Sequence, residues 1–281
     1  MRAQPMTTAV ETLGLIAGNR GLPLLLARQA RQLGVKRLVA VAFQGETDPQ
    51  LAGLVDEIVW VRVGQLGALI AALKQHQVRQ CVMVGQIAPR NLFEVRPDLR
   101  ALSLLFKLKE RNAHTLFGAV VAELQKEGIE VIEPTPWLRP FMPGAGFRLG
   151  PALRRTHRAD VAFGFRIAKE VARLDIGQTV VVKAGTVLAV EGFEGTDQCV
   201  ARGGDLAGPA GGAVAVKVAK PHHDLRFDIP CIGLQTIQTC LAHRVAVLAM
   251  EADRTLLLDQ DEIKARLRGA PLTVVATDGT T

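Results

Sequence analysis

Short apolar runs alternate with helix-like segments through the first half of the chain, and this alternation constrains the fold more than any other feature. Each run is four to six residues long, as expected of a buried strand. The segments between the runs carry apolar residues at helical spacing. A β-α-β-β-α-β order favours an open, mostly parallel sheet. We therefore predict a Rossmann-like α/β domain over residues 1–136, with strands at 13–17, 37–42, 58–61, 80–84 and 130–133 and helices at 22–33, 64–75, 97–110 and 112–127.

The second half of the chain also mixes strands and helices, but it contains a hairpin. Thr179–Lys183 and Thr186–Val190 flank Ala184-Gly185, which is typical of a tight turn between antiparallel strands. The glycine-rich residues 203–212 are predicted to be a flexible connector. We predict a second, smaller α/β domain with a mixed sheet over residues 157–281, with helices at 157–174, 233–243 and 260–268 and further strands at 214–218, 245–249, 255–259 and 272–276.

Residues 137–156 are predicted to link the two domains, because the stretch from Pro134 to Gly146 is rich in Pro and Gly. This stretch is unusually apolar for a linker. Two interpretations fit its large apolar side chains. They could pack between the domains or contact an acyl chain, and packing between domains is the more common outcome. The side chains in question are Trp137, Phe141, Met142 and Phe147.

Two glycine-containing turns of the first domain are candidate ligand sites. The residues expected to contact substrate there are Gly18, Asn19, Gly21, Leu22, Gly85, Gln86 and Arg90. The turn Gly18-Asn19-Arg20-Gly21 joins a predicted strand to a helix that opens with Leu22-Pro23, and the free N–H groups of such a helix terminus can bind an anion. An ordinary βα turn would look the same. The turn Gly85-Gln86 with Arg90 follows another strand, where ligands of parallel sheets bind.

A nicotinamide cofactor is disfavoured in this domain. The first turn has two of the three glycines of the dinucleotide fingerprint, and the second strand is followed by Phe43-Gln44 rather than by an acidic residue.

The loop from Lys217 to Gly233 gathers charges of both signs between two prolines, Pro221 and Pro230, that stiffen it. Such a loop suits phosphoryl chemistry, which needs cations for phosphate oxygens and a carboxylate for a metal ion or a water molecule. Asp228 is the main candidate for that carboxylate. Lys220 and Arg226 are candidate phosphate clamps.

A second acidic group, Glu194 and Asp197, is a candidate contributor to the same metal site. Thr196 or Asp197 could instead cap the helix that begins there. The adjacent pair His222-His223 is interpreted as solvated rather than metal-binding, because neighbouring side chains point in different directions on most backbones.

The composition indicates a globular protein with an anionic partner. The formal net charge is +7, and the Lys and Arg residues are spread along the chain. Aromatic residues make up 4% and Tyr is absent, so we expect no nucleic-acid partner. The four cysteines lack C-x-x-C spacing and are interpreted as buried thiols in a reducing compartment. Without a signal peptide or a spanning segment, we expect a cytoplasmic protein, with peripheral attachment to the membrane as an open alternative.

Several motifs together resemble one family, the LpxI-type UDP-2,3-diacylglucosamine pyrophosphatases of lipid A biosynthesis. The resemblance runs in the same order from about Leu13 to the end of the chain. Its most specific parts are the Glu194-Gly-Thr-Asp197 and Arg226-x-Asp228-x-Pro230 motifs. It is supported by Gly14–Gly18 with Gly21-Leu-Pro23, by Arg173–Gln178, by Val187–Glu191, and by Lys220-Pro221 and Ile232-Gly233.

The resemblance implies a function and a site. The family uses a divalent metal, Mg²⁺ or Mn²⁺, to cleave the diphosphate of UDP-2,3-diacylglucosamine into UMP and 2,3-diacylglucosamine 1-phosphate (lipid X). It implies two α/β domains with the ligand between them, a substrate taken from the cytoplasmic face of the inner membrane, and a homodimer through the C-terminal domain. The family's essential aspartate falls on Asp228 and its Thr-Asp pair on Thr196 and Asp197, so Asp228 and Asp197 are the expected catalytic residues and Asp228, Asp197 and Glu194 the expected metal ligands.

One departure keeps a second function open. The family carries an Asp-Asp pair where this chain has Ala113-His114, so metal binding here could differ. The alternative is a non-catalytic carrier that binds a UDP-sugar or a phospholipid in the same interdomain cleft. The segment 134–155 also diverges, which leaves the acyl-chain preference open.

Overall fold

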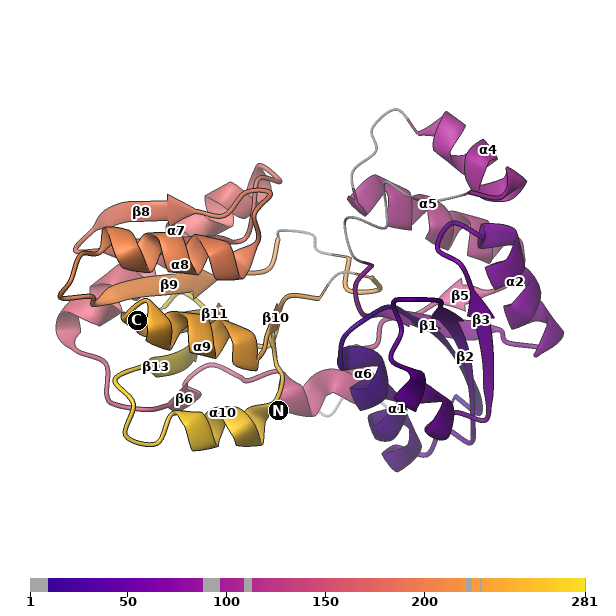
Figure 1. The fold of residues 1–281 in the computed structure, drawn as a ribbon, viewed down its shortest axis with the longest axis horizontal. Helices are drawn as coiled ribbons and strands as arrows, with labels where there is room; N and C mark the ends of the chain where they lie inside the picture. The colour runs from indigo at the N-terminus through magenta and orange to yellow at the C-terminus, as the bar shows by residue number, and fades with distance from the viewer. Residues whose placement is uncertain (1–9, 88–96, 109–112, 221–223, 228, 281) are drawn as a thin grey trace. The chain divides into compact units, whose positions relative to one another are not determined.

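The computed structural model describes residues 10–87, 97–108, 113–220, 224–227 and 229–280 (Figure 1). These residues form two compact units. The first comprises the chain up to Leu138 together with residues 225–227, and the second comprises Arg139–Asp224 and the chain from Ile229 onward. The prediction of two α/β domains is confirmed.

The first unit contains one sheet in which every pairing among the described residues is parallel, in the order β3-β2-β1-β4-β5. The predicted open parallel sheet is therefore present. Its strands are β1 (Thr12–Ala17), β2 (Arg37–Phe43), β3 (Glu57–Val61), β4 (Gln80–Val84) and β5 (Glu130–Val131). Its helices are α1 (Leu22–Gln32), the 3₁₀ helix η1 (Pro49–Gly53), α2 (Leu66–Gln75), α4 (Leu99–Lys107), α5 (Ala113–Lys126) and α6 (Thr135–Leu138).

The two faces of this sheet are covered by different helices. Ile16, Val39 and Val41 face a core built with α2, α4 and α5, to which Leu73 and Leu124 contribute fully buried side chains. Helix α1 contacts β4 and α6. Because both faces are covered, the strands are apolar almost throughout, as the sequence shows.

The second unit contains a mixed sheet, as predicted. Its order is β6-β13-β11-β9-β7-β8, in which β9, β11 and β13 are parallel and the other pairings are antiparallel. The strands are β6 (Arg148–Leu149), β7 (Thr179–Lys183), β8 (Thr186–Val190), β9 (Ala213–Lys217), β11 (Val245–Glu251) and β13 (Thr273–Thr277), and β10 (Cys231–Ile232) pairs separately with β12 (Leu256–Leu257). The helices are the 3₁₀ helix η2 (Arg139–Phe141), α7 (Arg155–Arg173), α8 (Thr196–Leu206), α9 (Leu234–Ala242) and α10 (Gln260–Arg266).

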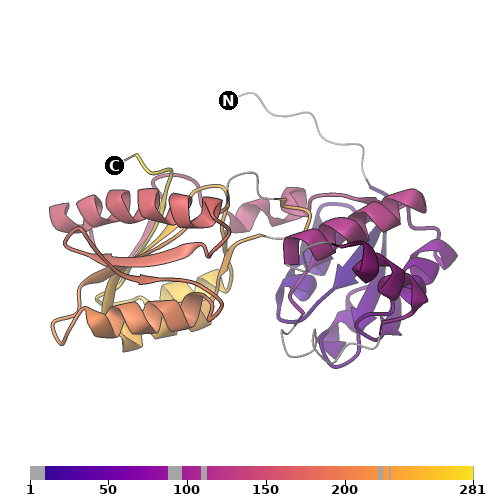
Figure 2. The same cartoon turned by 90° about the horizontal axis from the view of Figure 1, so that it is seen from above.

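Helix α7 covers one face of the second sheet, and α8 lies on the other (Figure 2). The strands alternate accordingly, because successive side chains of a strand point to opposite faces. Val180 and Val182 pack in the cluster that contains α7, and Val181 packs in the cluster that contains α8.

The predicted hairpin is also present. The backbone amides of Ala184 and Gly185 both donate to the Asp160 carboxylate at 2.9 Å. Both residues have positive φ, 48° and 72°, which suits the tight turn between twisted strands.

Residues 137–156, predicted to be a linker, are built into the units instead. Trp137 lies in α6 and is buried. Farther along, β6 pairs antiparallel with β13, and Phe147 packs against the core of the second unit. Met142 is buried as well, so three of the four large apolar side chains are packed, Trp137 in the first unit and Met142 and Phe147 in the second.

The glycine-rich connector over residues 203–212 is partly a helix. Helix α8 continues to Leu206, and Gly203 and Gly204 lie inside it. A Cβ on Gly203 would stand 2.4 Å from the Val181 Cβ, and one on Gly204 would stand 2.5 Å from the His243 carbonyl oxygen. These glycines are needed for close packing rather than for flexibility.

None of the four cysteines forms a disulfide; Cys231 is half-buried and the other three are buried. Burial raises the pKa of the Cys81 and Cys199 thiols to about 12, which keeps both protonated near neutral pH. Within the described residues, none of the helices combines the length and the apolar character that crossing a bilayer requires.

Candidate functional site

In the first unit, the candidate site lies at the carboxyl edge of the sheet, where β1 has β2 on one side and β4 on the other. Ligands of open parallel sheets bind where the strand order reverses in this way. The structure brings the two predicted turns together there. The Gly18 amide donates to the Val84 carbonyl at 2.8 Å, and the Asn19 amide donates to the Gln86 carbonyl at 2.7 Å.

The glycines of these turns allow the close approach of the two backbones. A Cβ on Gly18 would lie 2.4 Å from the Gln86 carbonyl oxygen. Gly85 has a φ of +90°, and a Cβ there would lie 2.7 Å from the Asn19 carbonyl oxygen. A structural requirement therefore accounts for Gly18 and Gly85. Gly21 precedes α1 with open space around its Cα.

Leu22, predicted to contact substrate, is buried in the first turn of α1.

The loop after β2 is fixed to the end of β1. The Asn19 Nδ2 donates to Glu46 Oε2 at 2.6 Å. The buried Thr47 hydroxyl donates to the Ala17 carbonyl at 2.5 Å and accepts from the Phe43 amide at 2.9 Å. Asn19 Oδ1 is buried without a hydrogen-bond partner among the described residues. The carboxyl ends of β1 and β2 thus form one rigid rim.

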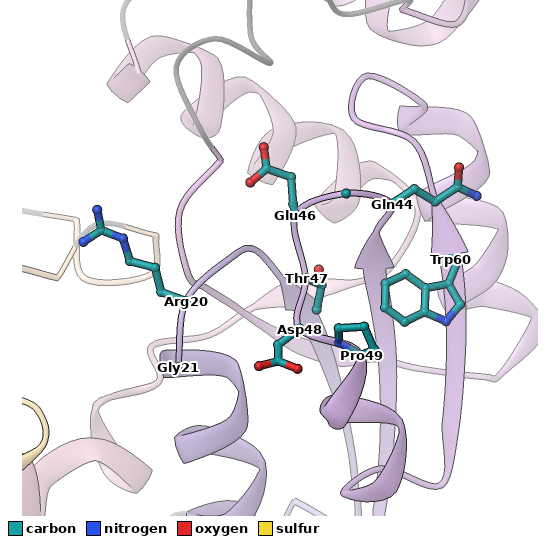
Figure 3. Close-up of a pocket in the computed structure, with 9 residues that line it drawn as sticks. Arg20, Gly21, Gln44, Glu46, Thr47, Asp48, Pro49 and Trp60 are labelled. Carbon is teal, nitrogen blue, oxygen red and sulfur yellow. The ribbon is translucent and has the colours of Figure 1, made fainter.

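An open hollow of about 710 Å³ lies beside this rim (Figure 3). In that view Arg20 lies on one side of the hollow and Gln44 and Trp60 on the other. The Trp60 side chain is 36% exposed. An indole beside amide, carboxylate and guanidinium groups suits a heterocyclic base with a ribose and a phosphate. The lining residues are Arg20, Gly21, Gln44, Gly45, Glu46, Thr47, Asp48, Pro49 and Trp60.

In the second unit, a buried lysine organises the carboxyl end of β9. Lys217 is 6% exposed, and its Nζ donates to the Thr196 hydroxyl at 3.0 Å and to the Cys231 carbonyl at 2.9 Å. The Thr196 hydroxyl donates in turn to Glu191 Oε1 at 3.0 Å. Glu191 is also 6% exposed, and its Oε2 accepts from the Gln178 amide at 3.2 Å. An ammonium and a carboxylate are therefore bridged by one hydroxyl.

This network corrects the capping interpretation of Thr196 and Asp197. Helix α8 begins after Gly195 with no side-chain cap. The Thr196 hydroxyl is engaged by the buried charges, and Asp197 Oδ1 accepts from the Thr236 hydroxyl on α9 at 2.6 Å. The two side chains fix the start of α8 to the sheet and to α9.

Glu194, a predicted metal ligand, is held by an ion pair. Its Oε1 accepts from Arg202 at 2.5 Å, and its Oε2 accepts from the Gly192 amide at 2.9 Å. The Arg202 guanidinium lowers the pKa of this carboxyl below its usual value. Across the described residues, no three His, Cys, Asp or Glu side chains come together as a metal site. The described part of the predicted ligand set does not by itself fit a metal ion.

The loop that follows β9 is anchored at several points. Lys220 pairs with Asp175, and the Ala219 amide donates to Glu251 Oε2 at 2.8 Å. Phe227 stacks on Phe117 of α5, with ring centroids 5.8 Å apart, and so belongs to the first unit.

Arg226 lies in the same turn as Phe227. Asp228, Arg90 and the histidine pair lie outside the described residues, as do the side chains of Ala113 and His114.

Sequence reasoning missed Lys217 and Glu191 as site residues. A signal was available for both, because each directly ends or follows an otherwise apolar strand, and charged side chains are rarely buried without partners. The hollow beside Trp60 gave no comparable signal, since its lining residues come from three separate segments.

The fold and the polar groups described above define a two-domain α/β protein with polar side chains gathered at the carboxyl ends of strands in each sheet. Family models identify it further. The model of the LpxI N-terminal domain matches residues 12–141, and that of the LpxI C-terminal domain matches residues 145–275. The chain belongs to the LpxI family.

Comparison with individual proteins gives the same family. The chain is 32% identical to the UDP-2,3-diacylglucosamine pyrophosphatase LpxI of Caulobacter vibrioides over 278 residues, which cover 95% of this chain and 97% of the relative. A solved structure titled glycinamide-RNase-transformylase T from Mycobacterium tuberculosis is similar over 64% of this chain and 44% of that one, at 15% identity and a TM-score of 0.25. A TM-score this low carries no functional meaning.

Proposed function

We propose that this chain hydrolyses the diphosphate of UDP-2,3-diacylglucosamine to UMP and 2,3-diacylglucosamine 1-phosphate. The observation that carries the proposal is the match to a relative of that name along 95% of the chain, through both domains. The charge of the protein agrees with it, because a net charge of +7 favours a substrate with two phosphates.

The first unit is proposed to hold the nucleotide. Its hollow offers the Trp60 indole for stacking, the Gln44 amide for the edge of a base, and the Arg20 guanidinium for a phosphate. The joined turns that contain Gly18, Asn19 and Gly21 and Gly85 and Gln86 are proposed to contact the substrate. Arg90 remains a proposed phosphate contact.

The start of α8 in the second unit and the loop that follows β9, whose residues 225–227 group with the first unit, are proposed to carry the hydrolytic chemistry. Asp228 is the proposed essential carboxylate, which orients or deprotonates the attacking water. Asp197 and Thr196 are proposed to take part at the start of α8, where backbone amides and Lys217 supply positive potential for developing charge on phosphate oxygens. Lys220 and Arg226 remain the proposed clamps.

Mg²⁺ or Mn²⁺ is part of the proposal through the family resemblance. A bound divalent ion would polarise a phosphoryl oxygen. Because Glu194 is engaged by Arg202 and by the Gly192 amide, we assign no step to the ion and propose Asp228 with Asp197 as the residues to test for it.

The lipid part of the substrate sets the proposed location. We propose a cytoplasmic protein that works peripherally at the inner-membrane face, where its lipid substrate would be found. We also propose a homodimer through the C-terminal domain, and we expect no nucleic-acid partner.

The proposal is tested by incubating the purified protein with UDP-2,3-diacylglucosamine in Mg²⁺, in Mn²⁺ and with a chelator. We expect UMP with either metal and none with the chelator. The carrier alternative, which the Ala113-His114 position keeps open, predicts saturable binding of the substrate without UMP. Turnover that is unaffected by the chelator would remove the metal from the proposal and keep the hydrolysis.

A further inference from the structure

Three large apolar side chains are exposed on two neighbouring loops of the second unit. Leu174 is 58% exposed, Ile176 is 53% exposed and Phe193 is 92% exposed. The first two follow α7, and the third follows β8. We call these three residues the apolar rim.

The two loops are in direct contact, so the rim is one surface. Gly177 approaches Glu191 so closely that a Cβ on the glycine would lie 2.1 Å from the Glu191 carbonyl oxygen. The Gln178 amide also donates to the Glu191 carboxylate. Ile176 directly precedes Gly177, and Phe193 lies two residues after Glu191.

The local fold does not require apolar side chains at these positions. Helix α7 ends at Arg173, and Asp175 turns the chain with a φ of 58°. Polar residues serve equally well in an exposed turn of this kind. An apolar surface that the fold leaves exposed is typical of a binding site.

The apolar rim adjoins the polar groups of the candidate site. Phe193 stands three residues before Thr196, which is hydrogen-bonded to the buried Lys217. Asp175, between Leu174 and Ile176, pairs with Lys220. A surface with apolar side chains beside the Lys220 ammonium complements a molecule with acyl chains beside a phosphate.

The apolar side chains of the predicted linker, which were the other candidates for contact with an acyl chain, are mostly packed. Trp137 and Met142 are buried, and Phe147 packs against the core of the second unit. We infer that Leu174, Ile176 and Phe193 receive the acyl chains of the lipid substrate. This inference rests on the proposed function and adds the residues that select for a lipid.

The test compares substrates that differ only in acyl-chain length. UDP-2,3-diacylglucosamine is prepared with long chains and with four-carbon chains, and each is used below the concentration at which it aggregates. The variant Ile176→Gln/Phe193→Ser should raise the KM for the long-chain substrate by about tenfold, because a contact with two large apolar side chains is lost. Its kcat/KM for the short-chain substrate should match that of the wild type.

Leu206→Gln is the matched control, since Leu206 is 60% exposed in the same unit but at the far end of α8. It should leave both substrates unchanged. An unchanged preference for long chains in the double variant would overturn the inference, and so would an equal loss with the two substrates. The inference would also be overturned if the double variant lost binding to phospholipid vesicles but kept its preference for long-chain substrate, because the apolar rim would then bind a bilayer. Absence of UMP from the wild-type protein would instead refute the proposed function.

Discussion

Replacing Lys217 with methionine should destabilise the second unit strongly. The lysine is 6% exposed, and its ammonium donates two hydrogen bonds, at 3.0 Å to Thr196 and at 2.9 Å to the Cys231 carbonyl. Hydrogen bonds to charged groups contribute about 1.5–3 kcal/mol each, and methionine keeps most of the side-chain volume. The expected loss in free energy of unfolding is therefore about 3–5 kcal/mol, part of it from the buried Glu191, which loses the ammonium that the Thr196 hydroxyl links to it.

The loss is measured by urea unfolding followed by circular dichroism. Lys183→Met is the matched control, because Lys183 also ends a strand, is half-buried, and makes one hydrogen bond to the Ala207 carbonyl at 2.6 Å. It should cost about 1 kcal/mol. The double variant Lys217→Met/Glu191→Gln should lose less than the sum of its single variants, by about 1–3 kcal/mol. Equal losses for the two lysine variants would show that the buried network around Lys217 adds no stability beyond that of an ordinary hydrogen bond.

Two further predictions concern the glycine turn after β1 and the ion pair between Arg202 and Glu194. Gly18→Ala should destabilise the first unit by about 1–3 kcal/mol, because its Cβ would lie 2.4 Å from a carbonyl oxygen, whereas Gly21→Ala, with open space, should change stability by less than about 1 kcal/mol. Tryptophan fluorescence in urea measures both, since both tryptophans lie in the first unit, and equal effects would contradict the assignment. Arg202→Gln should lower the free energy of unfolding by about 1 kcal/mol at pH 7. The difference should shrink as the pH falls below about 4, because the lowered pKa of Glu194 stabilises the fold only while that carboxyl is ionised; a difference that grows in acid would contradict this sign.

The regular elements could be predicted because local patterns determine them. The predicted strands Thr179–Lys183 and Thr186–Val190 coincide with β7 and β8, since branched apolar residues and a turn dipeptide leave few alternatives. Gly203 and Gly204 were misread, because a glycine that packs against a neighbouring strand looks the same in sequence as one in a flexible loop. Only the proximity of Val181 and His243 distinguishes the two cases.

The motifs of the candidate site could be predicted from the sequence, but the hydrogen bonds that join them could not. The sequence indicated Thr196 and Asp197, but their partners Lys217 and Thr236 stand 21 and 39 residues away. Pairings at such separations depend on how strands are ordered in the sheet, which periodicity does not specify. The same limit applies to Trp60, whose side chain lines a hollow with residues from two other loops.

The essential role proposed for Asp228 in the hydrolysis is tested by the release of UMP from UDP-2,3-diacylglucosamine by the wild type, Asp228→Asn and Asp224→Asn. The two variants remove one carboxylate charge each from the same loop. We expect UMP from the wild type and from Asp224→Asn, and a loss of at least about a hundredfold in kcat for Asp228→Asn with unchanged circular dichroism. No UMP from the wild type, or full turnover by Asp228→Asn, would contradict the account.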